Sequence, residues 1–116
     1  MFKISKAYRS WGRYPQTEPR AISSINWRQE GLRLDDQAES VLPFGYGRSY
    51  GDSCLNDDGV LLDTTGLNRF IAFDSENGIL TCEAGVSLAE ILRLIVPQGW
   101  FLAATPGTKF ITVGGA

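Results

Sequence analysis

The stretch of this sequence with the clearest chemical potential is a glycine-rich run at residues 45–53, which we name the glycine loop. Gly45, Gly47 and Gly51 lack a Cβ atom, so backbone amides in this run can turn toward a common point. Such a nest of amides binds anions. Arg48 and Ser49 lie between the glycines and add a planar positive fork and a hydroxyl donor, a combination that suits a diphosphate.

The glycine loop does not fit the two best-known phosphate-binding motifs. Its spacing, G-x-G-x-x-x-G, misses the Rossmann fingerprint by one residue, and residues 52–59 are too rich in turn formers to be the helix that the fingerprint requires. No Lys-Ser or Lys-Thr pair follows the glycines, as a P-loop needs. Taken alone, the run also fits a tight structural turn.

A second loop with similar chemistry lies at residues 106–115, and we name it the threonine loop. Its two ends, P-G-T at 106–108 and T-V-G-G at 112–115, again combine small residues, free amides and threonine hydroxyls. Two such loops can clamp one extended phosphate ligand. The pair therefore favours a binding site over a structural turn.

An α+β arrangement with a small mixed sheet is expected to position these loops. Residues 41–44 predict a strand that feeds the glycine loop, confined by Pro43 to a sheet edge or a strand end. Residues 60–63 predict a buried strand, and residues 70–74 and 79–84 predict a hairpin. We expect these last three strands to share one sheet, and residues 101–104 to form a further strand.

One helix is expected to pack on the sheet. Ser87 and Glu90 have the spacing of a capping box, and Pro97 with Gly99 ends the helix. Apolar residues recur between them at i, i+3, i+4 and i+7, namely Leu88, Ile91, Leu92 and Ile95. A chain of 116 residues allows one core. Residues 1–40 are expected to form an arm with short elements, ahead of a domain at 41–116.

Composition excludes several classes of function. A net charge of −2 argues against a nucleic-acid partner. The chain contains no histidine, which excludes within it a His zinc site, a His general base and a His-containing triad. Cys54 and Cys82 are interpreted as free buried thiols in a reducing, cytoplasmic setting, and neither a signal peptide nor a membrane span is expected. Asp57 and Asp58 indicate a solvated turn, so no metal site is predicted.

The aromatic residues have both structural and ligand-binding interpretations. Trp11, Trp27 and Trp100 are expected to be packing anchors. Tyr50 is expected to contact a ligand, whereas packing or exposure suits Tyr46 equally well. Asp52 fits an Asx turn, the commoner role for Asp after Gly.

Three motifs together resemble the vanillyl-alcohol oxidase superfamily, and in particular its bacterial FAD-linked oxidases. They are W-G-R at 11–13, the G-x-G-R-S-Y-G-D run at 45–52, and P-G-T-x-x-x-T-V-G-G-A at 106–116. The resemblance implies an FAD site in the first subdomain of a bipartite FAD-binding domain. The implied cofactor-binding residues are Pro43, Phe44, Gly45, Tyr46, Gly47, Arg48, Ser49, Tyr50, Gly51, Asp52 and Ser53 around the pyrophosphate, and Gly107, Thr108, Thr112, Val113, Gly114 and Gly115 on the other side.

The resemblance also implies a function. It is the oxidation of a CH–OH group of a sugar, sugar phosphate or prenyl-phosphate sugar, in a longer protein whose catalytic residues lie outside this chain. Arg48 stands where some sugar-alcohol oxidases of the superfamily carry a flavin-linking histidine, which implies non-covalent FAD. Two alternatives stay open: an aldonolactone or sugar-alcohol oxidase, and a non-catalytic phosphate-binding module. Alone, the chain is expected to lack activity and to self-associate through apolar surface at residues 110–113.

Overall fold

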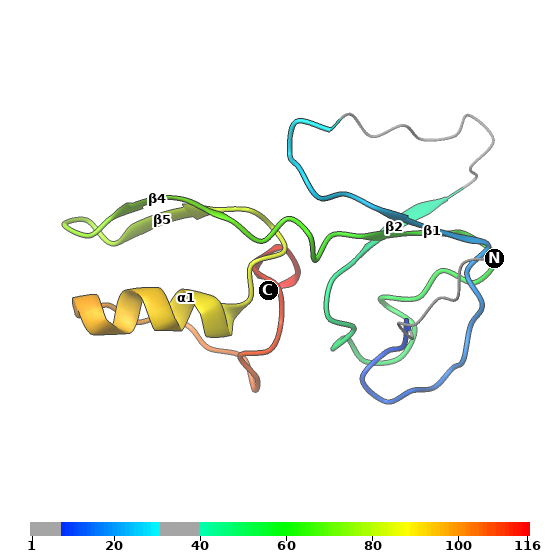
Figure 1. Ribbon diagram of the computed structural model, residues 1–116. Helices are drawn as coiled ribbons and strands as arrows, with labels where there is room; N and C mark the ends of the chain where they lie inside the picture. The colour runs from blue at the N-terminus through cyan, green and yellow to red at the C-terminus, as the bar shows by residue number, and fades with distance from the viewer. Residues whose placement is uncertain (1–7, 31–39) are drawn as a thin grey trace.

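The computed structural model describes residues 8–30 and 40–116, arranged as two small lobes (Figure 1). The first, which we name the parallel-sheet lobe, comprises residues 8–30 and 40–66. It contains strands β1 (Ala21–Ser24), β2 (Val41–Phe44) and β3 (Val60–Asp63), in the order β1-β3-β2. Both neighbouring pairs are parallel, so the three strands end at the same edge. The glycine loop leaves from this edge, at the end of β2.

Strand β2 is an edge strand, as Pro43 predicted. Its neighbour β3 is central and carries the most buried residues of the sheet, with Leu61 only 1% exposed. Pro43 lacks a backbone donor, and an edge position leaves one side of the strand without a partner that needs it. Strand β1 comes from the N-terminal arm, so the arm contributes directly to the sheet.

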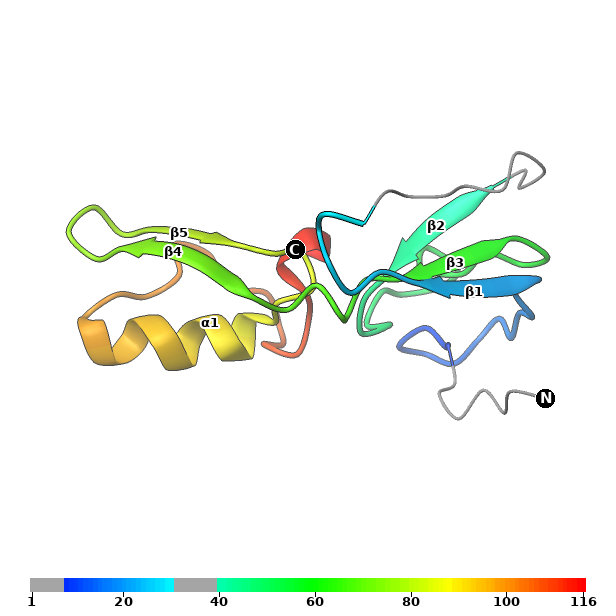
Figure 2. The same cartoon turned by 45° about the horizontal axis from the view of Figure 1, so that its top comes forward.

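The second lobe, the hairpin–helix lobe, comprises residues 67–116. Strands β4 (Phe70–Asp74) and β5 (Ile79–Cys82) form an antiparallel hairpin, and helix α1 (Leu88–Ile95) packs along it (Figure 2). The Ser87 hydroxyl accepts the Glu90 amide at 3.1 Å, which confirms the predicted N-cap. After a short 3-10 turn, Val96–Gln98, the chain reverses at Gly99 with φ of 86°.

Each lobe has its own hydrophobic cluster, which corrects the expectation of a single core. In the parallel-sheet lobe the cluster gathers Tyr8, Phe44, Cys54, Leu55 and Leu61. In the hairpin–helix lobe it gathers Val86, Leu88, Ile91 and Ile95. The apolar stripe of α1 therefore faces the hairpin. The reason for two clusters is that the chain between β3 and β4 runs as a turn, which separates the two sheets.

The α+β class with small sheets and one helix is confirmed, but two details of the prediction are wrong. β3 pairs with β1 and β2, and the hairpin strands pair only with each other among the described residues, so these three strands do not share a sheet. Residues 101–104 form bends instead of a strand. Phe101 is 66% exposed, and a strand pattern there had no neighbouring strand to receive it.

A buried carboxylate ties the hairpin–helix lobe to the N-terminal arm. Glu83, 5% exposed, accepts the Arg69 backbone amide at 3.0 Å and pairs with the Arg69 guanidinium at 3.3 Å. Its second oxygen lies 3.8 Å from Arg28 in the arm. The Arg69 side chain also donates to the Asn26 carbonyl at 2.6 Å. A charge this buried is tolerated because it is paired, and the pairing fixes the arm against the hairpin.

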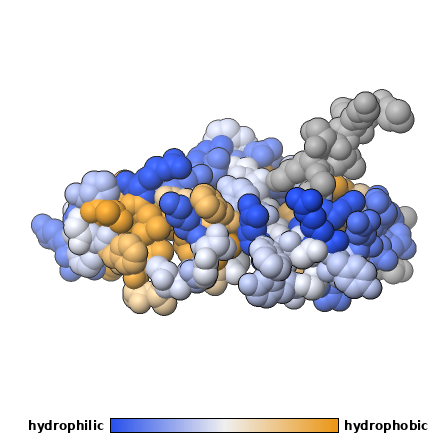
Figure 3. All heavy atoms as spheres, turned by 90° about the horizontal axis from the view of Figure 1, so that it is seen from below, coloured by the Kyte–Doolittle hydropathy of each residue, from blue (hydrophilic) through white to orange (hydrophobic). Residues whose placement is uncertain are grey.

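Apolar side chains gather on the outer surface of the molecule at the end that carries α1 (Figure 3). Among the apolar side chains of the hairpin–helix lobe, Val96, Phe101 and Phe110 are exposed. Ile111 and Val113, in contrast, pack against the cluster of the hairpin–helix lobe. Self-association through residues 110–113 therefore stays a prediction, with Phe110 as its exposed member. No helix within the described ranges is long and apolar enough to cross a membrane.

Candidate cofactor site

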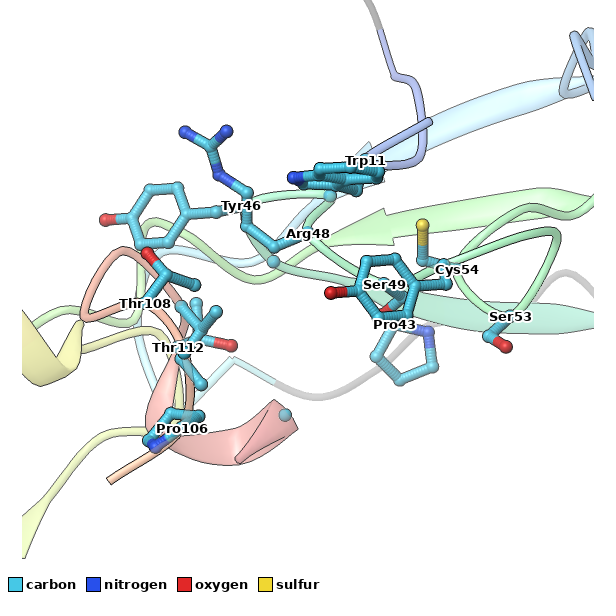
Figure 4. Close-up of a pocket in the computed structure, with 16 residues that line it drawn as sticks. Trp11, Pro43, Tyr46, Arg48, Ser49, Ser53, Cys54, Pro106, Thr108 and Thr112 are labelled. Carbon is cyan, nitrogen blue, oxygen red and sulfur yellow. The ribbon is translucent and has the colours of Figure 1, made fainter. Parts of the chain in front are cut away.

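The glycine loop and the threonine loop line one cleft between the two lobes. The cleft has a volume of about 680 Å³, within the roughly 300–1,000 Å³ typical of small-molecule and cofactor sites. Arg48 and Tyr46 come from the glycine loop on one side, and Thr108 and Thr112 from the threonine loop on the other (Figure 4). Two loops that are some sixty residues apart in sequence thus meet at one site, as the sequence predicted.

Glycine is required at the heart of the glycine loop. Gly47 has φ of 67°, and a Cβ atom there would collide with the Arg9 carbonyl oxygen and lie 2.7 Å from the Phe44 ring. Gly51 also has a positive φ, of 60°, but nothing lies within 4 Å of its missing Cβ. Gly47 therefore serves two purposes, a left-handed turn and a close approach to the N-terminal arm.

The amides of the glycine loop are available to a ligand, except that of Ser49, which donates to the Cys54 sulfur. Within residues 8–30 and 40–116, no amide from residue 45 to residue 53 donates to a backbone carbonyl oxygen. The Ser49 amide and hydroxyl face the Cys54 sulfur. Backbone donors that protein does not satisfy are satisfied by water or by a ligand. The loop can thus present several donors to one anion.

Arg48 supplies the positive charge of the cleft. Among the residues that the structure describes, it is the only charged side chain lining the cleft, and it forms no ion pair with another described residue. Beside it, burial raises the pKa of Tyr46, and the negative charges of Glu90 and Asp63 raise it further. The Tyr46 phenol is therefore neutral at physiological pH and can donate its proton in a hydrogen bond.

The C-terminal part of the threonine loop, residues 113–115, differs from the glycine loop in its hydrogen bonds. The amide of Val113 donates to Val86, that of Gly114 to Ala84 at 2.9 Å, and that of Gly115 to Thr112 at 3.1 Å. These amides are engaged within the protein, so the expectation that they are free is wrong. The cause is a 3-10 turn, Val113–Gly115, that packs against the lobe. Residues 113–115 therefore contribute shape to the cleft instead of a nest of amides, while Thr108 and Thr112 contribute hydroxyls.

The two loops touch at Gly45 and Thr112. A Cβ atom at Gly45 would lie 2.7 Å from the Thr112 Oγ1 atom and 2.8 Å from its methyl carbon. Thr112 is 7% exposed and also forms an isolated β-bridge with Ser87 at the start of α1. Glycine at position 45 thus allows the glycine loop to approach the helix N-terminus. This contact sets the width of the cleft at its base.

Most of the predicted binding residues line the cleft, and some do not. Those that line it are Pro43, Gly45, Tyr46, Gly47, Arg48, Ser49, Tyr50, Ser53, Gly107, Thr108, Thr112 and Gly115. Phe44 lies in the core of the parallel-sheet lobe, 3% exposed, and Val113 packs on the cluster of the other lobe. Gly51, Asp52 and Gly114 also lie outside the lining. Strand alternation turns Phe44 away from the cleft, and the 3-10 turn does the same for Val113 and Gly114, whereas Gly51 and Asp52 lie in the turn at 51–54.

Four further residues line the cleft that the sequence did not assign to it: Trp11, Cys54, Pro106 and Ile111. Burial raises the pKa of the Cys54 thiol, while hydrogen bonds from the Cys54 and Ser49 amides and the Ser49 hydroxyl lower it in part. Cys54 comes directly after the glycine loop, a position that could have indicated it. Both cysteines are free, as expected.

Trp11 differs most from its prediction. It is 62% exposed at the cleft, so it is not a packing anchor. Trp100 packs against the cluster of the hairpin–helix lobe, and its indole donates to the Ser75 carbonyl at 2.7 Å, which confirms its packing role. Trp27 lies under the Arg69 guanidinium, 3.8 Å from the ring centroid, and is itself 56% exposed.

Other carboxylates have structural roles. Asp57 accepts the Glu18 amide at 3.1 Å, and Asp58 adopts φ of 54° in a turn. Asp63 accepts hydrogen bonds from the Tyr8 hydroxyl at 2.8 Å and from the Thr65 amide at 2.9 Å. These bonds stabilise the turn that follows β3. Within the described part of the chain, no group of His, Cys, Asp or Glu side chains has the arrangement of a metal site.

Comparison with known proteins identifies the class to which this fold and cleft belong. The model of the FAD binding domain family matches residues 33–116, which include both loops of the cleft. The chain belongs to this family, and FAD is the cofactor that the family binds.

Individual relatives agree with this assignment. Decaprenylphosphoryl-beta-D-ribose oxidase of Mycolicibacterium smegmatis is 33% identical over 97% of this chain, and L-gulono-1,4-lactone dehydrogenase of Mycobacterium tuberculosis is 32% identical over 76% of it. The chain spans 25% and 21% of the length of these relatives. The solved structure of alkyldihydroxyacetonephosphate synthase shares the fold, with a TM-score of 0.54 and 22% identity over 65% of this chain and 16% of that one.

The residues of the cleft fit FAD chemically. FAD carries a diphosphate between two nucleoside-like halves, and the glycine loop provides amides and one guanidinium for the diphosphate. The cleft is also lined by the aromatic side chains of Trp11, Tyr46 and Tyr50, which suit planar rings.

Proposed function

We propose that this domain holds FAD non-covalently for an oxidoreductase that oxidises a CH–OH group of a sugar or sugar phosphate. The observation that carries the proposal is that one cleft holds Arg48 and glycine-loop amides that donate to no backbone carbonyl of the described residues, opposite the threonine loop. When bound, FAD supplies a hydride acceptor at flavin N5. The protein then contributes binding, orientation and electrostatics, and the catalytic residues lie outside this chain.

Each loop has its own task in this proposal. Arg48 and the amides of residues 45–51 bind the diphosphate, because charge-assisted donors in a partly enclosed cleft are the stronger hydrogen bonds. Thr108 and Thr112 lie on the opposite side of the cleft, where they would face the other side of the cofactor. Arg48 cannot form the covalent flavin link that a histidine can, so the attachment through this segment is non-covalent.

The names of the relatives support the proposed substrate class. The relative that matches 97% of this chain is named an oxidase of decaprenylphosphoryl-beta-D-ribose, which supports a prenyl-phosphate sugar as the substrate. The lactone dehydrogenase, which matches 76%, supports an aldonolactone as the second candidate. A phosphate-binding module without redox chemistry is the third, and flavin content separates it from the other two.

Flavin reduction in the full-length protein tests the proposal. The purified protein should carry a yellow flavin that acid precipitation releases into the supernatant. Its absorbance near the flavin band should bleach under anaerobic conditions with a prenyl-phosphate sugar, and not with L-gulono-1,4-lactone or D-lactate. Bleaching by the lactone alone would favour the second candidate. A protein that cannot be loaded with FAD would contradict the proposal.

A further inference from the structure

Trp11 and Tyr50 form an exposed aromatic pair at the cleft. Trp11 is 62% exposed and Tyr50 is 74% exposed, and both line the cleft. Their ring centroids lie 5.2 Å apart with the ring planes at 83°, an edge-to-face contact. Such a contact occupies at most one of the two faces of the indole. A large apolar surface therefore remains open toward the site.

The backbone holds this exposed tryptophan firmly. The Trp11 amide donates to the Ser49 carbonyl at 3.0 Å, which ties the arm to the glycine loop. Directly before it, Ser10 is only 4% exposed, and directly after it the chain turns through Arg13, whose φ is 57°. Tyr8 anchors the same segment through its hydrogen bond to Asp63. An ordered, exposed indole at a cleft is the arrangement of a ligand contact, because an aromatic ring kept in water gains nothing for the fold.

Arg48 gives the position of this pair relative to the ligand. Figure 4 shows the Trp11 indole on the same side of the cleft as the Arg48 side chain. In FAD, the diphosphate joins two halves that each carry a planar ring system, adenine in one and isoalloxazine in the other. A diphosphate of FAD bound at Arg48 would therefore bring one of these rings toward the aromatic pair. Base–aromatic stacking is worth about 1–3 kcal/mol per ring and tolerates different ring types, because every such ring has a π-face.

We propose that Trp11 is a cofactor-binding residue whose indole packs against a planar ring system of FAD, with Tyr50 holding the indole edge-on. This inference rests on the proposed function. It assigns to the N-terminal arm a direct part in the cofactor site, beyond its contribution of β1 to the sheet. The chemistry recognised is a π-face, which either the adenine or the isoalloxazine ring presents.

Calorimetric titration of the full-length apoprotein with FAD tests the proposal. Trp11→Ala should raise the Kd of FAD about 5- to 150-fold, the range expected for the loss of one stacked ring. Trp11→Phe, which keeps a smaller ring, should lose less. Trp27→Ala is the matched control, because Trp27 is similarly exposed at 56% but lies under the Arg69 guanidinium and outside the cleft lining, and it should leave the Kd unchanged.

Separate titrations with ADP and FMN identify the ring. A loss on Trp11→Ala confined to ADP assigns the adenine, and one confined to FMN assigns the isoalloxazine; either supports the proposal. A Trp11→Ala protein with native circular dichroism and a Kd for FAD within twofold of wild type overturns it while leaving the proposed function intact. Failure of the wild-type protein to bind FAD overturns the proposed function, and this inference with it.

Discussion

The glycine loop and the C-terminal part of the threonine loop, residues 113–115, are both rich in glycine but differ in their hydrogen bonds. The glycine loop follows an edge strand and donates none of its amides to backbone carbonyls within the described residues, whereas the amides at 113–115 of the threonine loop are all engaged. Small residues and glycines therefore do not by themselves indicate an anion site. Whether the amides are free depends on what packs beneath the loop.

The comparison also explains why the site is asymmetric. The threonine loop packs against Ala84 and Val86 at the end of the hairpin, so its backbone is part of the second lobe. The glycine loop is fastened mainly at its ends, by Phe44 in the core and by the Ser49 carbonyl, which accepts from Trp11. We expect the glycine loop to bind the ligand and the threonine loop to shape the cleft.

The largest expected effect is on the fold of the glycine loop itself. Gly47→Ala should destabilise the protein by about 3 kcal/mol, because it combines a left-handed backbone, costing roughly 1–2 kcal/mol, with overpacking against Phe44 of about 1–3 kcal/mol. Urea unfolding measures this change. Gly107→Ala, where nothing lies within 4 Å, is the control and should be close to neutral. Equal free energies of unfolding for the two variants would show that position 47 does not require glycine.

Removal of the positive charge should affect binding more than stability. Arg48→Ala is expected to weaken FAD by about 1.5–3 kcal/mol, the scale of a hydrogen bond to a charged group. Arg48→Lys should recover only part of this, because an ammonium lacks the planar fork. Arg93→Ala, on the outer face of α1, is the control. Unchanged affinity in Arg48→Ala would mean that the diphosphate lies elsewhere.

A smaller effect is expected at the base of the glycine loop, where Tyr8 packs edge-on against Phe44 with centroids 5.1 Å apart. Burial, and then the hydrogen bond to Asp63 and its charge, raise the pKa of Tyr8 from its ordinary 10.0 to about 12. Folding therefore favours the protonated phenol. Its contribution to stability is fully present below pH 10 and is lost as the pH rises through 12.

Tyr8→Phe tests this linkage. It should cost about 1–3 kcal/mol at neutral pH, because Asp63 loses a buried donor, and it should flatten the decline of stability between pH 10 and pH 12. Unfolding free energies measured across that range give the slope. An unchanged slope would mean that another group causes the alkaline loss.

The smallest effects are expected in the threonine loop. Thr108→Ala removes a hydroxyl that faces the cleft and should weaken FAD by about 0.5–1.5 kcal/mol. Gly115→Ala should leave affinity unchanged, since its amide already donates to Thr112 and a Cβ there meets only an ordinary contact at 3.4 Å. Isothermal titration calorimetry with FAD measures the affinity of each variant. A larger loss of FAD affinity in Gly115→Ala than in Arg48→Ala would mean that the threonine loop, and not the glycine loop, binds the diphosphate.

Local signals made much of this fold predictable. Pro43 indicated an edge strand, and Ser87 with Glu90 indicated the start of α1. The pairing of β3 with β1 was not predictable, because parallel partners are set by tertiary contacts and β1 has little alternation, with three of its four residues exposed. The exposure of Trp11 at the cleft was not predictable for the same reason. It depends on a turn at Arg13, which no periodicity in the sequence indicates.

Amide hydrogen exchange in the full-length protein, with and without FAD, tests the central claim most directly. Peptides that cover residues 45–51 should exchange quickly in the apoprotein and become strongly protected when FAD binds, since their amides then acquire an acceptor. Peptides that cover residues 113–116 should be slow in both states, because their amides donate within the protein already. Protection that appears only at 113–116, with residues 45–51 unchanged, would contradict the account.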